Sequence, residues 1–136
     1  MVIDSSALLA IFLGETEGEA FEEAIAHAPM RLLPATCLLE ARMVLVTRRG
    51  ERALVDLDLW LIRAGVEIVP VDQDLVDLAI AAWLAFGKGR HPAGLNFVDC
   101  LSCALARRSG EALLFKGEDF GRTDIPRVLP SPRTDP

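Results

Sequence analysis

The chain has 136 residues, 51% of them hydrophobic, which is enough to fold as one domain around an apolar core. Its formal net charge of −6 argues against a nucleic-acid scaffold protein, whose binding surface is usually basic, but not against an enzyme whose acidic residues hold a metal ion. The high apolar fraction fits either a rich core or an apolar surface that a partner covers.

The N-terminal half of the chain predicts short strands alternating with helices. We expect strands at residues 1–3 and 31–33, and helices at residues 5–12, 18–27, 36–48 and 52–64. Ser5 and Ser6 can cap the first of these helices, and Pro34 should end the second strand. Gly50 follows the third helix and should close it.

The C-terminal half continues this alternation. We expect strands at residues 67–71, 112–115 and 127–129, and helices at residues 73–86 and 97–108. Asp72 and Asn96 should cap these two helices. The segment from Gly87 to Gly94 is rich in glycine and basic residues and is the clearest loop. We expect one domain over residues 1–130, followed by a flexible tail at residues 131–136.

Strands that alternate with helices imply an α/β architecture with a mainly parallel sheet. Such sheets bind their ligands beyond the carboxyl ends of the strands. Asp4 and the turn from Lys116 to Asp119 directly follow predicted strands, so we expect them at that edge. Asp99 lies in the first turn of a helix, which a strand-to-helix connection would bring to the same edge.

Four carboxylates stand within or beside apolar stretches: Asp4, Glu40, Asp99 and Asp119. A carboxylate in apolar surroundings is costly unless it is paired, hydrogen-bonded or bound to a metal. Each also has a simpler explanation. Asp4 could cap a helix, and Asp99 could form a capping pair with Asn96. Glu40 could be a surface residue, and Asp119 an ordinary turn residue. A single cause would explain all four: a site for Mg²⁺ or Mn²⁺, suited to phosphodiester chemistry.

The cysteines and the N-terminal residues indicate in which cellular compartment the protein is expected. Three cysteines, an odd number, favour a reducing compartment over a disulfide framework. Cys100 and Cys103 form a C-x-x-C within an apolar helical pattern, which indicates small core residues rather than zinc ligands. Asp4 interrupts the first apolar stretch, so we expect no signal peptide. No segment reaches the roughly 20 apolar residues of a membrane span, and we expect a cytoplasmic protein without membrane contact.

Four blocks of the chain resemble PIN-domain ribonucleases, and most closely the VapC toxins of bacterial toxin–antitoxin pairs. The blocks are residues 1–8, the helix around Glu40, residues 94–100 and residues 114–120. The resemblance implies a three-layer α/β/α fold with an acidic pocket that holds Mg²⁺ or Mn²⁺. In this pocket Asp4 and Asp99 would bind the metal directly. Glu40 and Asp119 would act through water or position the attacking water.

The resemblance also implies supporting residues, a reaction and partners. Ser6 and Asn96 match polar residues near the pocket, whereas Lys116 stands where many relatives have threonine. The implied reaction is endonucleolytic hydrolysis of RNA by a metal-activated water, leaving a 5′-phosphate and a 3′-hydroxyl. Arg90, His91 and Lys116 are candidate contacts to the RNA backbone. A VapB-like antitoxin should neutralise the enzyme, and a homodimer is expected.

The same residues allow three rival interpretations. A haloacid-dehalogenase-like phosphatase needs a second aspartate two residues after the first, where Ser6 stands. A response-regulator-like receiver, which is a non-catalytic binding module, needs paired acids after its first strand, and Asp4 has no acidic neighbour. A PIN-like module that has lost its activity stays open, although all four acids are present.

Overall fold

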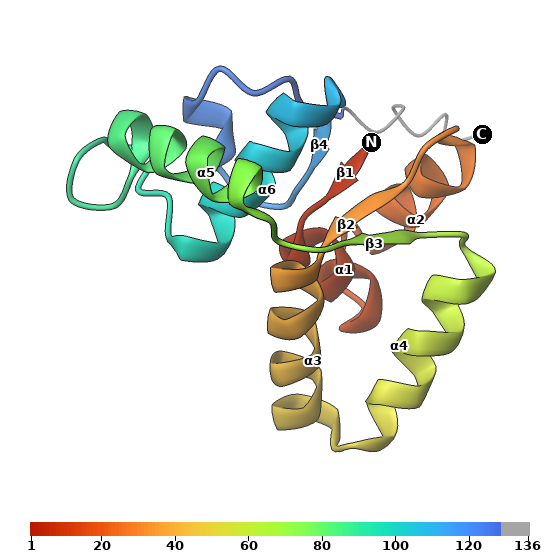
Figure 1. Ribbon diagram of the computed structural model, residues 1–136. Coiled ribbons are helices and arrows are strands. Elements are labelled where there is room, and N and C mark those ends of the chain that lie inside the picture. The colour runs from red at the N-terminus through yellow and green to blue at the C-terminus, as the bar shows by residue number, and fades with distance from the viewer. Residues whose placement is uncertain (129–136) are drawn as a thin grey trace.

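The computed structural model describes residues 1–128 of the chain (Figure 1). Its strands are β1 (Val2–Ile3), β2 (Leu32–Pro34), β3 (Glu67–Val69) and β4 (Leu113–Leu114). Its helices are α1 (Ser5–Phe12), α2 (Gly18–His27), α3 (Ala35–Arg49), α4 (Arg52–Arg63), α5 (Gln73–Phe86) and α6 (Phe97–Ser109). A short 3-10 helix, Phe120–Arg122, follows β4. The expected alternation of strands and helices is therefore confirmed.

The strands of the described residues form one sheet in the order β3-β2-β1-β4, and every pairing is parallel. Val2 on β1 lies opposite Leu32 on one side and Leu113 on the other. Because β1 lies in the interior of the sheet, the residue that follows it emerges between the carboxyl ends of β2 and β4. That residue is Asp4.

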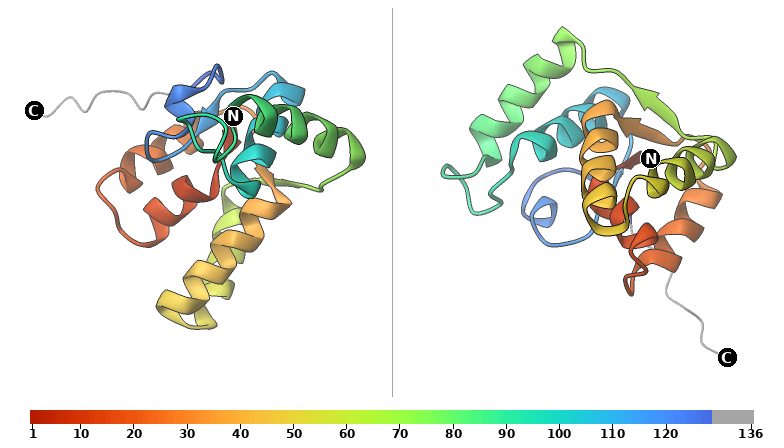
Figure 2. Two further views of the ribbon diagram at one scale, coloured as in Figure 1. Left: turned by 90° about the vertical axis from the view of Figure 1, so that its left-hand side faces the viewer. Right: turned by 90° about the horizontal axis from the view of Figure 1, so that it is seen from below.

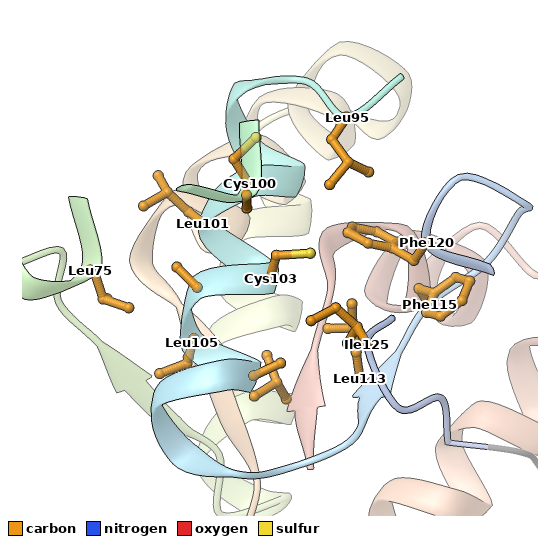
Figure 3. Packing of buried hydrophobic residues seen from close by; sticks show 14 of the residues in the cluster. Leu75, Leu95, Cys100, Leu101, Cys103, Leu105, Leu113, Phe115, Phe120 and Ile125 are labelled. Atoms are coloured by element: carbon orange, nitrogen blue, oxygen red, sulfur yellow. The ribbon is translucent and has the colours of Figure 1, made fainter. Parts of the chain in front are cut away.

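Helices cover both faces of the sheet. Successive strand residues point to opposite faces, so each strand contributes side chains to two cores. Val2, Leu32 and Leu113 pack against α5 and α6 in one core (Figure 3). Ile3, Leu33 and Leu114 pack against α1, α2, α3 and α4 in the other. The three-layer α/β/α architecture is thus confirmed.

Two of the cysteines belong to the core beneath α5 and α6. Cys100 and Cys103 are buried on α6, and neither forms a disulfide. Burial raises the pKa of the Cys100 thiol to about 11 and that of the Cys103 thiol to about 12. Both thiols stay protonated at neutral pH, so their interpretation as small core residues is confirmed.

Several boundaries differ from those expected. Asp4 rather than Ser5 or Ser6 caps α1, because its carboxylate accepts a hydrogen bond from the backbone N–H of Ser6 at 3.0 Å. Pro34 belongs to β2, and α3 begins directly after it. The 3-10 helix after β4 was not predicted.

The expected strand at residues 127–129 is wrong as far as the structure describes it. Arg127 forms only an isolated bridge with Leu113. Residue 129 and the expected tail at 131–136 lie outside the described residues, and the domain boundary at residue 130 stays a prediction.

Helices α3 and α4 form an arm that extends beyond the rest of the molecule (Figure 2). Arg42 on α3 and Asp58 on α4 form an ion pair across it, with N and O atoms 2.9 Å apart. Among residues 1–128, no helix combines the length and apolar character that crossing a membrane requires.

Candidate active site

The four predicted carboxylates come from four different elements at the carboxyl edge of the sheet. Asp4 follows β1, and Asp119 lies in the segment after β4. Glu40 lies in the second turn of α3, which follows β2, and Asp99 lies in the first turn of α6. Because β2, β1 and β4 are neighbours and parallel, these segments leave the sheet on the same side.

Asp4 is buried, with only 2% of its surface exposed, and both carboxylate oxygens accept hydrogen bonds. The backbone N–H and the hydroxyl of Ser6 donate to Oδ2 at 3.0 and 2.6 Å. The hydroxyl of Ser102 donates to Oδ1 at 2.6 Å, and the Cys37 thiol lies 3.7 Å from the same oxygen. Such charge-assisted hydrogen bonds offset the cost of burying the carboxylate and fix its orientation.

Ser5 and Ser6 tie this end of β1 to two neighbouring elements. The Ser6 hydroxyl, besides donating to Asp4, accepts a hydrogen bond from the backbone N–H of Lys116 at 3.0 Å. The Ser5 hydroxyl donates to Glu40 Oε1 at 2.5 Å. The segment after β4 and the side chain of Glu40 are thereby held beside Asp4.

Asp99 has a structural and an electrostatic role together. It forms the expected capping box with Asn96: the Asn96 side chain accepts from the Asp99 N–H at 2.9 Å, and Asp99 Oδ2 accepts from the Asn96 N–H at 3.0 Å. Burial raises the pKa of the Asp99 carboxyl to about 6, against the lowering effect of the Asn96 N–H. The negative charges of Asp4, Asp119 and Glu40 raise it further. The other three carboxylates are therefore near enough to Asp99 to repel its charge.

These side chains have the chemistry of a site for Mg²⁺ or Mn²⁺. Their ligand atoms are carboxylate oxygens, which both ions prefer. Among residues 1–128, none of the four forms an ion pair with a lysine or arginine, so their charge is left uncompensated. In the same part of the chain, no three His, Cys, Asp or Glu side chains gather closely enough to hold an ion together. The set fits an ion held by one or two carboxylates, with water filling its other positions, as is common for Mg²⁺.

The model of the PIN domain matches residues 1–126 of the chain. The chain belongs to the PIN-domain family. It is 50% identical to ribonuclease VapC30 of Mycobacterium tuberculosis over 128 residues, which cover 94% of this chain and 98% of that protein. It is also 50% identical to a ribonuclease VapC of Mycolicibacterium smegmatis over 128 residues, covering 94% of this chain and 99% of the relative.

Solved structures share the fold of this PIN domain. The crystal structure of Mycobacterium tuberculosis VapC20, described as a sarcin-ricin loop cleaving toxin, superimposes with a TM-score of 0.76 at 25% identity. The match covers 95% of this chain and 98% of that one. A VapBC2 complex of Rickettsia felis has a TM-score of 0.72 at 15% identity, with 94% and 96% covered, and supports the fold alone.

The predicted RNA-contacting residues of this PIN domain have contacts within the chain. The Lys116 side chain forms ion pairs with Glu15 and Glu17. The Arg90 guanidinium lies 4.9 Å from the ring centroid of Trp83. His91 Nδ1 accepts a hydrogen bond from the N–H of the nearby loop residue 93 at 3.0 Å. Their contact with RNA stays a prediction.

Ser102 and Cys37, which contact Asp4 directly, were not predicted from the sequence. Ser102 is fully buried, and its hydroxyl lies 3.1 Å from the Cys37 thiol. One signal was available: Ser102 is the hydroxyl residue within the apolar run of α6, three residues after Asp99 and thus on the same side of the helix. Cys37 offered no signal, because a cysteine in an apolar helix looks like core.

Proposed function

We propose that this chain is a metal-dependent endoribonuclease, the toxin of a type II toxin–antitoxin system. The observation that carries the proposal is the set of four carboxylates without ion pairs at the carboxyl edge of the sheet, in a chain 50% identical to VapC ribonucleases. The identity of 50% extends over nearly the full length of this chain and of both relatives, which supports the same activity. The substrate class is RNA, and the reaction is hydrolysis of a phosphodiester bond.

Asp4 and Asp99 would hold the Mg²⁺ or Mn²⁺ ion. When bound, such an ion lowers the pKa of water and neutralises negative charge that develops on the phosphate oxygens. Asp4 is suited to this role because hydrogen bonds from Ser6 and Ser102 fix its carboxylate before anything binds. Asp99 is suited because its carboxylate lies in the combined negative field of the other three acids.

Glu40 and Asp119 would orient the attacking water and accept its proton. Glu40 Oε1 accepts from Ser5, which fixes the side chain, and among residues 1–128 no group donates to its other oxygen. The Asp119 side chain makes no capping hydrogen bond to the 3-10 helix that follows it. Attack by water on phosphorus would leave a 5′-phosphate and a 3′-hydroxyl.

The RNA backbone would be contacted by Arg90, His91 and Lys116. A cation near the acidic edge reduces the repulsion between phosphate and carboxylates. Lys116 lies three residues before Asp119, and its backbone N–H donates a hydrogen bond to the Ser6 hydroxyl beside Asp4. It is therefore held close to the site. Its ion pairs with Glu15 and Glu17 are exposed, so exchanging them for a phosphate contact costs little.

Two protein partners belong to the proposal. A VapB-like antitoxin would cover the acidic site, and an arginine of that partner would supply the positive charge that the four carboxylates lack. A second copy of the chain would form a homodimer, which fits the exposed apolar side chains of α5 and α6. We expect the enzyme to act in the cytoplasm, which fits its free thiols.

The test is RNA cleavage with and without Mg²⁺ or Mn²⁺ by the wild type, Asp4→Asn and Asp99→Asn. We expect metal-dependent cleavage by the wild type and a loss of at least about 100-fold in each variant, because each loses a charged ligand. Asp56→Asn, on the exposed side of α4, is the matched control and should cleave like the wild type. Cleavage in EDTA, or full activity in both site variants, would contradict the mechanism. No cleavage of any RNA by the wild type would favour a PIN-like binding module without catalysis.

A further inference from the structure

A buried network of three polar side chains joins α3, α6 and the end of β1. Cys37 lies on α3, Ser102 lies on α6, and Asp4 follows β1. Cys37 and Ser102 are fully buried, and Asp4 is 2% exposed. The Ser102 hydroxyl lies 2.6 Å from Asp4 Oδ1 and 3.1 Å from the Cys37 sulfur. Buried polar groups are costly unless they satisfy one another, so this network favours one arrangement of its members.

The hydrogen bonds of this network run in one direction. An ionised carboxylate only accepts, so the single hydroxyl proton of Ser102 points to Asp4. The Ser102 oxygen is then left as an acceptor for the Cys37 thiol, which donates to it. The thiol lies farther from Asp4 Oδ1, at 3.7 Å, than from Ser102. Cys37 therefore acts on Asp4 mainly through Ser102.

This direction decides which acceptor site of Asp4 stays free. The two oxygens of a carboxylate offer about four lone-pair sites together. Within residues 1–128, the N–H and the hydroxyl of Ser6 occupy the sites on Oδ2, and Ser102 occupies one on Oδ1. The site that remains for an ion is on Oδ1. Ser102 is thus the donor that shares its acceptor oxygen with the ion.

The network also links the helical turns that carry two further acids. Cys37 precedes Glu40 by three residues on α3, and Ser102 follows Asp99 by three residues on α6. Residues three apart lie on the same side of a helix. The contact between Cys37 and Ser102 therefore sets how closely the turns that present Glu40 and Asp99 approach each other.

We propose that Cys37 is a positioning residue of the metal site. Its thiol orients the Ser102 hydroxyl toward Asp4, and its contact with Ser102 holds α3 and α6 at the spacing that lets the carboxylates share one ion. The inference rests on the metal-dependent nuclease proposed above and adds a residue that acts on the ion through two others. A purely structural cysteine would change the stability of the fold and leave metal affinity as it is.

The first experiment compares Mn²⁺ affinity in two cysteine variants by calorimetric titration. Removing a direct partner of a metal ligand weakens binding about tenfold or more, and Cys37 acts one step further away. We therefore expect Cys37→Ala to bind Mn²⁺ roughly 3- to 10-fold more weakly than the wild type. Cys37→Ser, which keeps a donor, should recover most of the affinity.

Cys103→Ala is the matched control for this experiment. Cys103 is as buried as Cys37 but lies in the other core, beneath α5 and α6 (Figure 3). Cys103→Ala should bind Mn²⁺ like the wild type, and circular dichroism checks that all variants fold. Equal Mn²⁺ affinities in Cys37→Ala and Cys103→Ala would overturn the inference.

The second experiment tests whether Cys37 acts through Ser102. In the double variant Cys37→Ala/Ser102→Ala, the loss of Cys37 should add nothing to the loss of Mn²⁺ affinity that Ser102→Ala causes alone. Losses that multiply in the double variant would show that the two residues act separately, and they would overturn the inference.

Infrared spectra of the metal-free protein test the same contact without any ion. The S–H stretching band of Cys37 is the difference between the spectra of the wild type and Cys37→Ala. A donated hydrogen bond changes its frequency, so the band should shift when Ser102→Ala removes the acceptor. A band that does not move would overturn the inference. RNA cleavage is measured separately, so a protein that binds Mn²⁺ with the expected dependence on Cys37 but cleaves no RNA ends the nuclease proposal and leaves this role of Cys37 standing.

Discussion

The end of β1 and the start of α6 each supply one aspartate to the site, and they hold it differently. Asp4 is buried, and three strong donors, from the Ser6 backbone, the Ser6 hydroxyl and the Ser102 hydroxyl, satisfy its two oxygens. Asp99 is only partly buried, and a single backbone N–H, that of Asn96, donates to its carboxylate. The protein therefore stabilises the charge of Asp4 with hydrogen bonds, whereas the charge of Asp99 is repelled by the neighbouring carboxylates.

This difference assigns the two aspartates different roles in a metal site: one fixes the position of the ion, and the other gains most in energy when the ion binds. A carboxylate held by donors on several sides is rigid and sets where an ion would lie. A carboxylate whose pKa is raised to about 6 by burial and by neighbouring charges gains most when a cation arrives. We therefore expect substitutions of the two aspartates to change the stability of the protein without metal in opposite directions.

The largest effect is expected for Asp4→Ala. This change removes the cap of α1 and leaves the Ser6 N–H and the Ser102 hydroxyl without their acceptor. Together these losses should lower the free energy of unfolding by about 2–4 kcal/mol. Urea unfolding monitored by circular dichroism measures it. Asp72→Ala removes the cap of α5 together with an exposed ion pair to Arg108, and it should still cost less. Equal losses in the two variants would mean that Asp4 is no more than a helix cap.

Metal binding should give the next largest effect. If Asp99 gains most from a cation, saturating Mn²⁺ should stabilise the wild type by about 2–3 kcal/mol in the free energy of unfolding. The same Mn²⁺ should stabilise Asp99→Asn much less. Thermal unfolding at several Mn²⁺ concentrations measures both without any RNA. A variant stabilised as strongly as the wild type would show that Asp99 does not hold the ion.

The helices, the strands and the four acids could be predicted from the sequence because they depend on local signals. The helix at 18–27 matches α2, and glycines and caps bounded α3, α5 and α6 to within a residue or two. The simpler explanations for Asp4 and Asp99 as caps are confirmed by their capping hydrogen bonds. The capping role of Asp99 does not compete with metal binding, since within residues 1–128 only its Oδ2 accepts a hydrogen bond and Oδ1 is left for an ion.

The supporting contacts of the site could not be predicted in the same way. Ser102 meets Asp4 across 98 positions of sequence, and Cys37 meets Ser102 across 65, so both contacts depend on how α3 and α6 pack on the sheet. Helical periodicity assigns a residue to a buried face but does not tell which buried residue of another element it meets.

Asp99→Asn should raise the stability of the metal-free protein at neutral pH. The folded pKa of about 6 lies above the ordinary value of 3.8, so the folded state binds the proton more tightly than the unfolded state. Stability of the wild type therefore falls as pH rises from about 4 to about 6, and it stays lower above that.

The variant lacks this penalty and keeps an acceptor for the Asn96 N–H. Allowing for partial exposure, we expect Asp99→Asn to be about 1–2 kcal/mol more stable than the wild type at pH 7.5 in EDTA. The difference should shrink toward pH 4, where the wild-type carboxyl is protonated in the folded state and about half ionised in the unfolded state. Chemical unfolding from pH 4 to pH 8 measures it. A variant that is less stable at pH 7.5 would mean that the capping contact outweighs the repulsion.

The smallest effect is expected for Ser102→Ala, which weakens the hold on Asp4 without removing its charge. Loss of one buried hydroxyl donor should cost about 1–2 kcal/mol of unfolding free energy. Ser109→Ala is the control, because Ser109 lies on the same helix and donates to the carbonyl of residue 105, far from the acids along the chain. The two variants should differ most in metal affinity. A less rigid Asp4 should weaken Mn²⁺ binding roughly 10-fold in Ser102→Ala, whereas Ser109→Ala should bind like the wild type. Calorimetric titration of Mn²⁺ measures this. Unchanged affinity in Ser102→Ala would reduce Ser102 to a core contact and leave Ser6 as the residue that orients Asp4.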